Sequence, residues 1–314
     1  MRTRNKPSIA FQLSSLKDNI LHNKVLYLMV IPGLVFFVMI RIIPILGSVI
    51  AWQRYSIFRG ILGSPWVGWA NFREMFAYEG FYRVLSNTML IGFYRVVIGF
   101  PVPIILALLL NEVKSIKFQK FAQSALYLPY FLSWVVVGQL FMNALHPSTG
   151  IVNILLTRFG VEPVFFFGQP QYFHALVTIS YIWKFAGYQS IIYLAAISTV
   201  DPSLYEAAEI DGAGPLVKIF RITLPIIAPV IIIMMLLSIG QFMEIGFDQI
   251  YVMMNPLVRS TADIFDTYIY RVGLVNGRFS ITTAIGLFKS LVGLVLIMGG
   301  NFISQKWLGR GLFR

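Results

Sequence analysis

Six long apolar stretches divide this sequence, and the shorter segments between them carry most of its charged residues. The stretches cover residues 25–52, 85–110, 123–145, 173–198, 224–245 and 281–302. About 20 apolar residues in helical conformation cross the hydrocarbon core of a bilayer. Because irregular backbone cannot be exposed to lipid, the pattern predicts six transmembrane helices. The expected fold class is therefore an all-α polytopic membrane protein.

The composition agrees with solvation by lipid rather than by water. Hydrophobic residues make up 57% of the chain and charged residues only 12%, with a mean hydropathy of +0.75. Soluble domains carry about 25% charged residues, and half of that cannot solvate a protein surface of this size. The absence of cysteine excludes disulfides and thiolate metal sites.

The distribution of Lys and Arg between the apolar stretches predicts the orientation. The two termini, the second-to-third loop and the fourth-to-fifth loop hold 13 of these residues, and the other three loops hold 8. Positive charge retains segments in the cytoplasm, so both termini and the fourth-to-fifth loop are expected there. The same effect explains the net charge of +12, and we expect no nucleic-acid binding.

The boundaries divide the chain into a cytoplasmic tail (1–24), a transmembrane domain (25–302) and a second cytoplasmic tail (303–314). The first apolar stretch is too long for a cleaved signal peptide, and we expect it to remain as an anchor. In the first tail, apolar residues recur at helical spacing, which is typical of an amphipathic helix in the membrane interface. A disordered basic tail fits the same residues. These residues are Ile9, Leu13, Leu16 and Ile20.

A small acidic segment, LYEAAEIDGAG, interrupts the apolar character in the fourth-to-fifth loop. Asp201 followed by Pro202 predicts a helix start, with a capping carboxylate and a proline in the first turn. Asp211-Gly212 predicts its end, because glycine supplies the left-handed cap. A second start at Pro215 completes a loop of two short helices across the cytoplasmic membrane face.

The first of these helices combines acidic and very small side chains. Glu206 and Glu209 lie near the positive end of its dipole. Ala207 and Ala208 favour helix and add almost no bulk. A short capped helix of this kind suits insertion into a groove of a partner protein. An ordinary interhelical loop accounts for the same residues without a partner.

The amino-acid sequence of this loop favours the first interpretation, a helix that inserts into a groove of a partner protein. EAAEIDGAGPLVKIFRITLP resembles the EAA signature of permease subunits of binding-protein-dependent ABC importers. In that family Glu-Ala-Ala is followed by Asp-Gly-Ala and then by Ile-x-Leu-Pro. TGIVNILL, GFDQIYVMMNP, DIFDTYIYRVGL and other stretches resemble the carbohydrate-importing branch, and within it permeases for oligosaccharides and polysaccharide fragments, the alginate-importer type included. The matching positions of the EAA signature are Glu206, Ala207, Ala208, Asp211, Gly212, Ala213, Ile222, Leu224 and Pro225.

The resemblance implies an ABC importer permease in the bacterial inner membrane, with the loop 201–225 as its coupling element. It implies a second homologous permease, two ATP-binding subunits below and an extracytoplasmic solute-binding protein above. ATP and Mg would belong to the ATP-binding subunits, and this chain would hold no cofactor or metal. The residues expected to contact the ATPase are Glu206, Ala207, Ala208, Asp211, Gly212, Ala213, Gly214, Leu224 and Pro225.

The chain itself shows no pattern for catalysis, and we do not expect an enzyme. The Lys-Ser pair in GLFKS lacks the glycines of a phosphate-binding loop. His22, His146 and His174 are scattered without the spacing of metal ligands.

Ionisable residues within the apolar stretches are candidates for a substrate path, because an unpaired charge costs a few kcal/mol at mid-bilayer. Structural explanations compete: Lys184 could pair with a neighbouring subunit, Lys289 with Glu244, and Asp248 could cap a helix. The excess of bases is compatible with an anionic sugar such as a uronate oligomer. The bases are Arg41, Arg95, Lys184 and Lys289, and the acids are Glu244 and Asp248.

Aromatic side chains extend this set, because pyranose faces stack on aromatic rings. Interfacial or core packing explains the same aromatic residues. The segments 161–173 and 247–279 are expected either to dock the solute-binding protein or to form a packed cap. The complete set of path candidates is Trp183, Lys184, Tyr188, Phe242, Glu244, Asp248 and Lys289, with Tyr193 as a further aromatic.

The sequence thus predicts a permease that moves oligosaccharides, uronate oligomers among them, by alternating access driven by ATP hydrolysis in partner subunits. Two alternatives stay open. A scaffold or sensor subunit would dock an ATPase without moving solute. An intramembrane enzyme would turn over substrate as the isolated chain.

Overall fold

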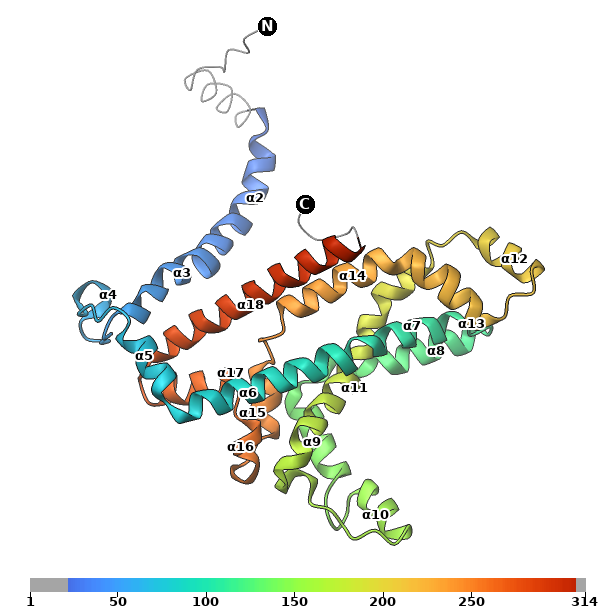
Figure 1. The fold of residues 1–314 in the computed structure, drawn as a ribbon. Helices are drawn as coiled ribbons and strands as arrows, with labels where there is room; N and C mark the ends of the chain where they lie inside the picture. Colours follow the sequence, from blue (N-terminus) through green and yellow to red (C-terminus); the bar gives the residue numbers. More distant parts are fainter. Residues whose placement is uncertain (1–21, 309–314) are drawn as a thin grey trace, which may run out of the picture.

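The computed structural model describes residues 22–308 and shows an almost entirely helical chain (Figure 1). Over that range the only strand-like pairing is one isolated bridge between Gln53 and Trp66. The structure confirms the all-α class. The proposed amphipathic helix of the N-terminal tail lies outside the described residues, as do residues 309–314.

Helical segments occupy all six predicted stretches. In the described part of the chain, four runs are long and apolar enough to span a bilayer, and a bent pair supplies a fifth. The bent pair, Ile116–Phe131 and Trp134–Ala144, turns by 106° at its break. The four runs are Lys24–Trp52, Glu79–Asn111, Pro215–Gly240 and Phe279–Lys306.

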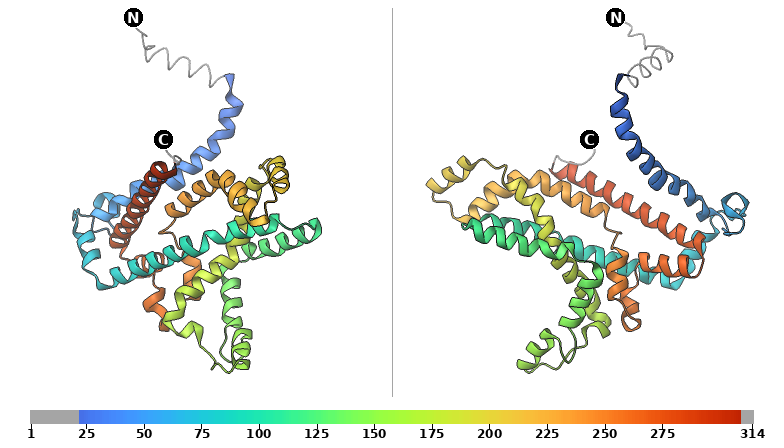
Figure 2. Two further views of the ribbon diagram at one scale, coloured as in Figure 1. Left: turned by 45° about the vertical axis from the view of Figure 1, so that its right-hand side comes forward. Right: turned by 180° about the vertical axis from the view of Figure 1, so that it is seen from behind.

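The fourth predicted stretch is α11 (Pro170–Ile197), a helix of 28 residues that is more polar than the other spans. It contacts α7 (Pro101–Asn111), α8 (Ile116–Tyr127) and α14 (Leu224–Gly240). Its surface is therefore covered by helices more than by lipid, and it buries polar residues such as Ser180 along its length. Figure 2 shows α11, in yellow-green, crossing the other helices of the bundle at an angle.

Three of the spans share one irregularity, a π-helical turn that ends just before a proline. The turns are η1 (Val38–Ile42), η3 (Arg95–Gly99) and η6 (Ile219–Thr223), and the prolines are Pro44, Pro101 and Pro225. A proline has no N–H and its ring clashes with the carbonyl four residues earlier. The wider turn accommodates the proline, so each span continues as a helix instead of breaking.

The first span leaves the bundle (Figure 1). It consists of α2 (Lys24–Phe37), η1, α3 (Ile43–Gly47) and the 3-10 helix η2 (Ser48–Trp52). No residue of α2, η1 or α3 is buried within this chain. Their apolar surface is therefore free to contact lipid or another subunit.

The remaining helices connect and complete the spans. Two buried clusters, one that includes Phe173 of α11 and one that includes Ile285 of α18, hold several of them together. The remaining helices are α4 (Gly60–Gly63), α5 (Ala70–Ala77), α6 (Glu79–Tyr94), η4 (Leu128–Phe131), α9 (Trp134–Ala144), α10 (Ile151–Arg158), η5 (Phe166–Gly168), α12 (Pro202–Ile210), α13 (Pro215–Lys218), α15 (Phe247–Met253), η7 (Pro256–Val258), α16 (Arg259–Ala262), α17 (Phe265–Tyr268), η8 (Ile269–Val275) and α18 (Phe279–Leu308).

A glycine sets the closest helix contact at the centre of the bundle. Gly187 of α11 lies against the backbone of Leu126 in α8, and a Cβ at this position would overlap the Leu126 carbonyl oxygen. Small residues let helix backbones approach in this way inside membranes. The position of α8, and of the bend that follows it, therefore depends on Gly187.

We expect Gly187→Ala to lower the free energy of unfolding by about 1–3 kcal/mol, because neither backbone can yield without moving a helix. The measurement is the thermal unfolding of the purified protein in detergent. Gly299→Ala in α18 is the matched control, since nothing lies within 4 Å of its added Cβ. An unfolding temperature that is equally unaffected in both variants would contradict the assignment of this contact.

Candidate functional site

The predicted small helix is present as α12, and both of its ends are capped as expected. The Asp201 carboxylate accepts a hydrogen bond from the backbone N–H of Ser203 at 2.9 Å. Hydrogen bonds from Ser203 hold the pKa of Asp201 below its usual value. At the other end Gly212 adopts a φ of +76°, which favours glycine.

The C-terminal cap of α12 is a Schellman motif. The N–H of Ala213 donates to the carbonyl of Ala208 at 2.8 Å, and the N–H of Gly212 donates to that of Glu209 at 3.1 Å. These bonds satisfy carbonyls that a short helix would otherwise leave open. Because both ends are fixed, α12 is a compact unit that can move without unravelling.

The second predicted loop helix starts at Pro215 as expected, but the prediction that it is a separate short helix is wrong. From Pro215 the chain runs through α13, η6 and α14 as one helical run to Gly240. The physical reason is the π-helical turn before Pro225, which lets the helix pass the proline without ending. A displacement at Pro215 is therefore carried directly into the span.

A half-buried hydrogen bond joins α12 to this continuous helix. The Tyr205 hydroxyl lies 2.8 Å from the hydroxyl of Thr223, which is 2% exposed. The Tyr205 ring packs against the cluster around Ile197 and Ile227. Lys218 also pairs with Glu209 at 3.8 Å across the loop. Tyr205 is thus the rigid link between α12 and the spans.

The other side of the loop is exposed and partly apolar. Ile210 is 88% exposed, Leu216 69% and Phe220 66%, and Figure 1 shows α12 projecting from the bundle. Exposed apolar groups clustered in this way mark an interaction surface. Of the predicted contact residues, Glu206, Ala207, Asp211, Gly212, Gly214 and Pro225 are exposed, while Ala208, Ala213 and Leu224 are half-buried.

Lys184 occupies a place that the sequence did not predict. Its ammonium group donates to the backbone carbonyls of Tyr130, at 2.8 Å, of Leu132 and of Pro129. These carbonyls lie at the break of the bent helix pair. In lipid, backbone groups released by such a break must find partners within the protein. Lys184 therefore stabilises the bend by hydrogen bonds to its backbone carbonyls.

The aromatic path candidates lie beside this bend. Tyr188 stacks on Tyr130 with ring centroids 3.7 Å apart and an interplanar angle of 4°. Trp183 makes an edge contact with Phe141 at 5.8 Å. Both α11 residues stay about two-fifths exposed, Tyr188 at 41% and Trp183 at 43%. Their free ring surface is available to a solute or to a neighbouring chain.

Lys289 and Glu244 line one cavity of about 530 Å³ between α14 and α18. The expected pairing of these two residues is wrong, because Lys289 pairs with Asp266 at 2.6 Å. Asp266 belongs to α17, which folds back onto α18 and brings a carboxylate to the lysine. Glu244 keeps an exposed carboxylate in the same cavity.

The other two path candidates lie apart from this pair. Asp248 is exposed in the first turn of α15, where a carboxylate favours the helix dipole, but it does not cap the helix, whose N-cap residue is Gly246. Phe242 is half-buried, and its carbonyl oxygen lies 2.6 Å from the place of a Cβ on Gly92. Phe242 therefore marks the contact between α6 and the end of α14.

A second cavity, of about 180 Å³, is lined by residues of η3, α7, α11 and α14, and its polar side chains come from η3, from α11 and from the end of α14 and the residue that follows it. Arg95 lies over the Tyr181 ring at 4.2 Å and donates to the side-chain oxygen of Gln249. Its Nε is buried without a hydrogen-bond partner. Sequence reasoning missed Gln189, Ser238 and Gln241 of this lining; their signal is a polar side chain within an otherwise apolar span.

Comparison with known proteins defines the class. Residues 8–309 match the family described as binding-protein-dependent transport system inner membrane component, and the chain belongs to this family. The fold is thus that of an ABC importer permease, as predicted.

Individual relatives are similar over nearly the whole chain. The polygalacturonan/rhamnogalacturonan transport system permease protein YteP of Bacillus subtilis (strain 168) is 45% identical over 94% of this chain and 92% of its own. Protein LplB of the same organism is 42% identical over 93% and 92%. A solved bacterial ABC transporter involved in the import of the acidic polysaccharide alginate superposes with a TM-score of 0.86 at 38% identity, covering 93% of this chain and 99% of that chain.

We expect Lys184→Met to destabilise the protein, because it leaves the carbonyls at the bend without a donor, at a cost of about 1–3 kcal/mol. Thermal unfolding in detergent measures the effect, and Lys114→Met in an exposed loop is the control. If Lys184 served only to contact solute, Lys184→Met would change transport and leave the unfolding temperature of the protein unchanged.

Proposed function

We propose that this permease carries acidic oligosaccharides across the bacterial cytoplasmic membrane and that α12 is the element through which ATP hydrolysis drives it. The observation that carries the proposal is the capped α12, exposed on one side and hydrogen-bonded to the fifth span through Tyr205 on the other. Relatives support the substrate class. One is named for polygalacturonan, a polymer of a sugar acid, and another for alginate.

The proposed assembly contains a second homologous permease, two ATP-binding subunits that hold ATP and Mg, and an extracytoplasmic solute-binding protein. A solved alginate transporter in complex with an alginate pentasaccharide-bound periplasmic protein, TM-score 0.86 to this chain, supports the last of these. The first span, with no buried residue in α2, leaves apolar surface for the second permease or lipid.

The proposed orientation places both termini and α12 in the cytoplasm. It rests on the excess of Lys and Arg in those segments. The opposite end of the molecule, formed by α10, α15 and α16, then faces the solute-binding protein (Figure 1).

Alternating access follows from this arrangement. A partner that binds α12 differently in its ATP-bound and ATP-free states shifts the permease between two conformations. The Schellman cap keeps α12 intact during the movement, and the run from Pro215 to Gly240 carries it into the membrane. This chain contributes position and movement, and the bond-breaking step belongs to the ATP-binding subunits.

A scaffold or sensor that docks an ATPase without moving solute is not favoured. Proteins named as transport permeases match this chain over more than nine-tenths of its length. The polar cavity around Arg95, between helices of the spans, is also more than a scaffold requires.

We expect Gly212→Pro and Glu206→Lys to abolish uptake while the protein still inserts into the membrane. Proline cannot adopt the φ of +76° at Gly212, and Glu206→Lys reverses the charge on the exposed face of α12. The measurement is ATP-dependent uptake by the complete complex in proteoliposomes. Glu112→Lys, in another exposed cytoplasmic-side loop, is the charge-matched control. Uptake at the unaltered rate in both α12 variants would remove the case for coupling.

The substrate class has its own test. In proteoliposomes with the solute-binding protein outside, the complex should accumulate galacturonate oligomers in preference to neutral oligosaccharides of equal length. Transport only of neutral sugars, amino acids or peptides would overturn the acidic-oligosaccharide proposal and leave the permease class intact.

A further inference from the structure

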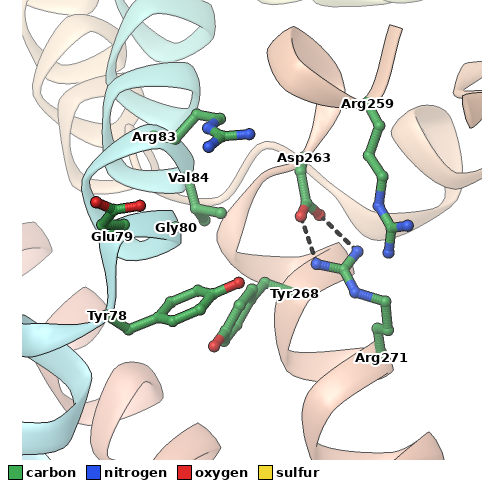
Figure 3. A pocket seen from close by; sticks show the side chains of 9 residues that line it. All are labelled: Tyr78, Glu79, Gly80, Arg83, Val84, Arg259, Asp263, Tyr268 and Arg271. Carbon is green, nitrogen blue, oxygen red and sulfur yellow. Dashed lines mark hydrogen bonds and ion pairs between the residues drawn. The ribbon is translucent and has the colours of Figure 1, made fainter. Parts of the chain in front are cut away.

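A cavity of about 380 Å³ lies at the end of the molecule opposite α12. Its walls are the first turns of α6 on one side and the segment from α16 to η8 on the other (Figure 3). α16 contacts the start of α11, where His174 Nε2 lies 2.9 Å from the Thr261 carbonyl oxygen. α12 follows the far end of the same helix, about 42 Å away by helix geometry.

Polar contacts fix the two walls of this cavity against each other. The Asn87 amide of α6 donates to the carbonyls of Ser260 and Asp263, both at 3.0 Å. The backbone N–H of Phe265 donates to the Thr88 hydroxyl at 3.2 Å. Asn87 and Thr88 are buried. The cavity is therefore preformed, which lowers the entropy cost of binding a ligand.

Three guanidinium groups line this single cavity. One of them, on Arg271, is committed to a carboxylate: it donates to Asp263 at 2.5 and 3.1 Å. Asp263 is 7% exposed, and its hydrogen bond raises the pKa of Arg271. This pair is a neutral, half-buried part of the wall, and two of the five guanidinium donors are used in it.

The other two arginines have no such partner. Arg83 and Arg259 are exposed, and neither guanidinium group makes an ion pair or hydrogen bond with any residue in the described range. They come from opposite walls, and Figure 3 shows their side chains on either side of the Asp263 carboxylate. Like charges that face one cavity repel each other, and an anion placed between them relieves that repulsion.

The remaining acid of the lining does not neutralise them. Glu79 lies in the first turn of α6, where its carboxylate favours the helix dipole. In Figure 3 it lies on the far side of Arg83 from Arg259. With Asp263 matched by Arg271, the lining keeps an excess of one positive charge, which is carried by Arg83 and Arg259 against Glu79.

An aromatic floor accompanies the arginines. The rings of Tyr78 and Tyr268 lie 5.7 Å apart, centroid to centroid, at an interplanar angle of 43°. Tyr268 is 7% exposed and Tyr78 is 50% exposed, so one ring is fixed while the other offers free surface. Aromatic faces of this kind suit the apolar face of a sugar ring.

We propose that this cavity binds a uronate unit of the incoming oligosaccharide, with its carboxylate between Arg83 and Arg259 and its ring against Tyr78. The proposal rests on the proposed function and adds a residue-level site at the entrance of the path. Guanidinium groups match a carboxylate by paired N–H donors, and Arg is preferred to Lys where that geometry matters.

The shape of the site favours a sugar over the other source of a carboxylate, an acidic side chain of the docked solute-binding protein. A volume of about 380 Å³ falls within the range of small-ligand pockets, about 300–1,000 Å³. A docking surface is broad instead and buries about 800 Å² on each partner. The tyrosine ring beside the arginines also provides a contact that a sugar uses and a carboxylate side chain does not need.

The test uses Arg83→Gln, Arg259→Gln and the double variant in the complete complex in proteoliposomes, with Arg73→Gln as control. Arg73 is an exposed arginine of the neighbouring α5 and does not line the cavity. Arg271 is left unchanged, because its removal would strand the buried Asp263 carboxylate. Two quantities are measured: the apparent KM for uptake of a galacturonate oligomer, and the affinity of the ligand-free solute-binding protein for the complex.

We expect the apparent KM to rise by up to about fivefold in each single variant, as for exposed ion pairs, and further in the double variant. Docking of the ligand-free binding protein should stay unchanged. An unaltered KM in the double variant would overturn the proposal while uptake by the unaltered complex upholds the proposed function. Weakened docking by the same factor as the rise in KM would also overturn it, because the arginines would then contact the binding protein. Absence of uptake by the unaltered complex would refute the proposed function itself.

Discussion

The whole structure depends on one requirement of the bilayer: every backbone N–H and C=O group at membrane depth must find a partner within the protein. This chain contains prolines in three spans and a sharp bend in a further helix pair, so its helices release backbone groups repeatedly. Two devices satisfy them. π-helical turns precede Pro44, Pro101 and Pro225, and the Lys184 ammonium donates to the carbonyls at the bend. The irregular places are thus built into the fold without exposing polar backbone to lipid.

The π-helical turn before Pro225 also determines how α12 is connected to the fifth span. Because η6 carries the helix past Pro225, the loop and the fifth span form one continuous run from Pro215. The half-buried Tyr205 packs against the same helix and is hydrogen-bonded to Thr223, which attaches α12 to it. The same run lines the cavity around Arg95 with Ser238. In the proposed mechanism, one helix therefore connects α12 with this cavity.

The sequence predicted well those features that depend on neighbouring residues, such as the ends of α12. Asp201-Pro202 and Asp211-Gly212 act within one turn of the backbone, and both ends of α12 are where those residues indicate. Apolar length likewise located the six helical stretches. Contacts between distant segments left no such trace: Lys289 pairs with Asp266 of a folded-back loop rather than with the acid in the adjacent span. For the same reason, no sequence pattern predicted that Lys184 would donate hydrogen bonds to the carbonyls of a bend more than fifty residues earlier in the chain.

The partners of the charged residues separate structural from functional roles more sharply than position does. Lys184, Lys289 and Arg271 each satisfy a named group of this chain: carbonyls at a bend, Asp266 and Asp263. Each of these charged groups has a partner within this chain and stabilises the fold. Arg83 and Arg259 lie in a preformed cavity and satisfy none in the described range. We infer that a charge kept without an internal partner in such a cavity, beside an aromatic ring, serves an external ligand, and for the acidic oligosaccharides proposed as substrates that ligand is a carboxylate.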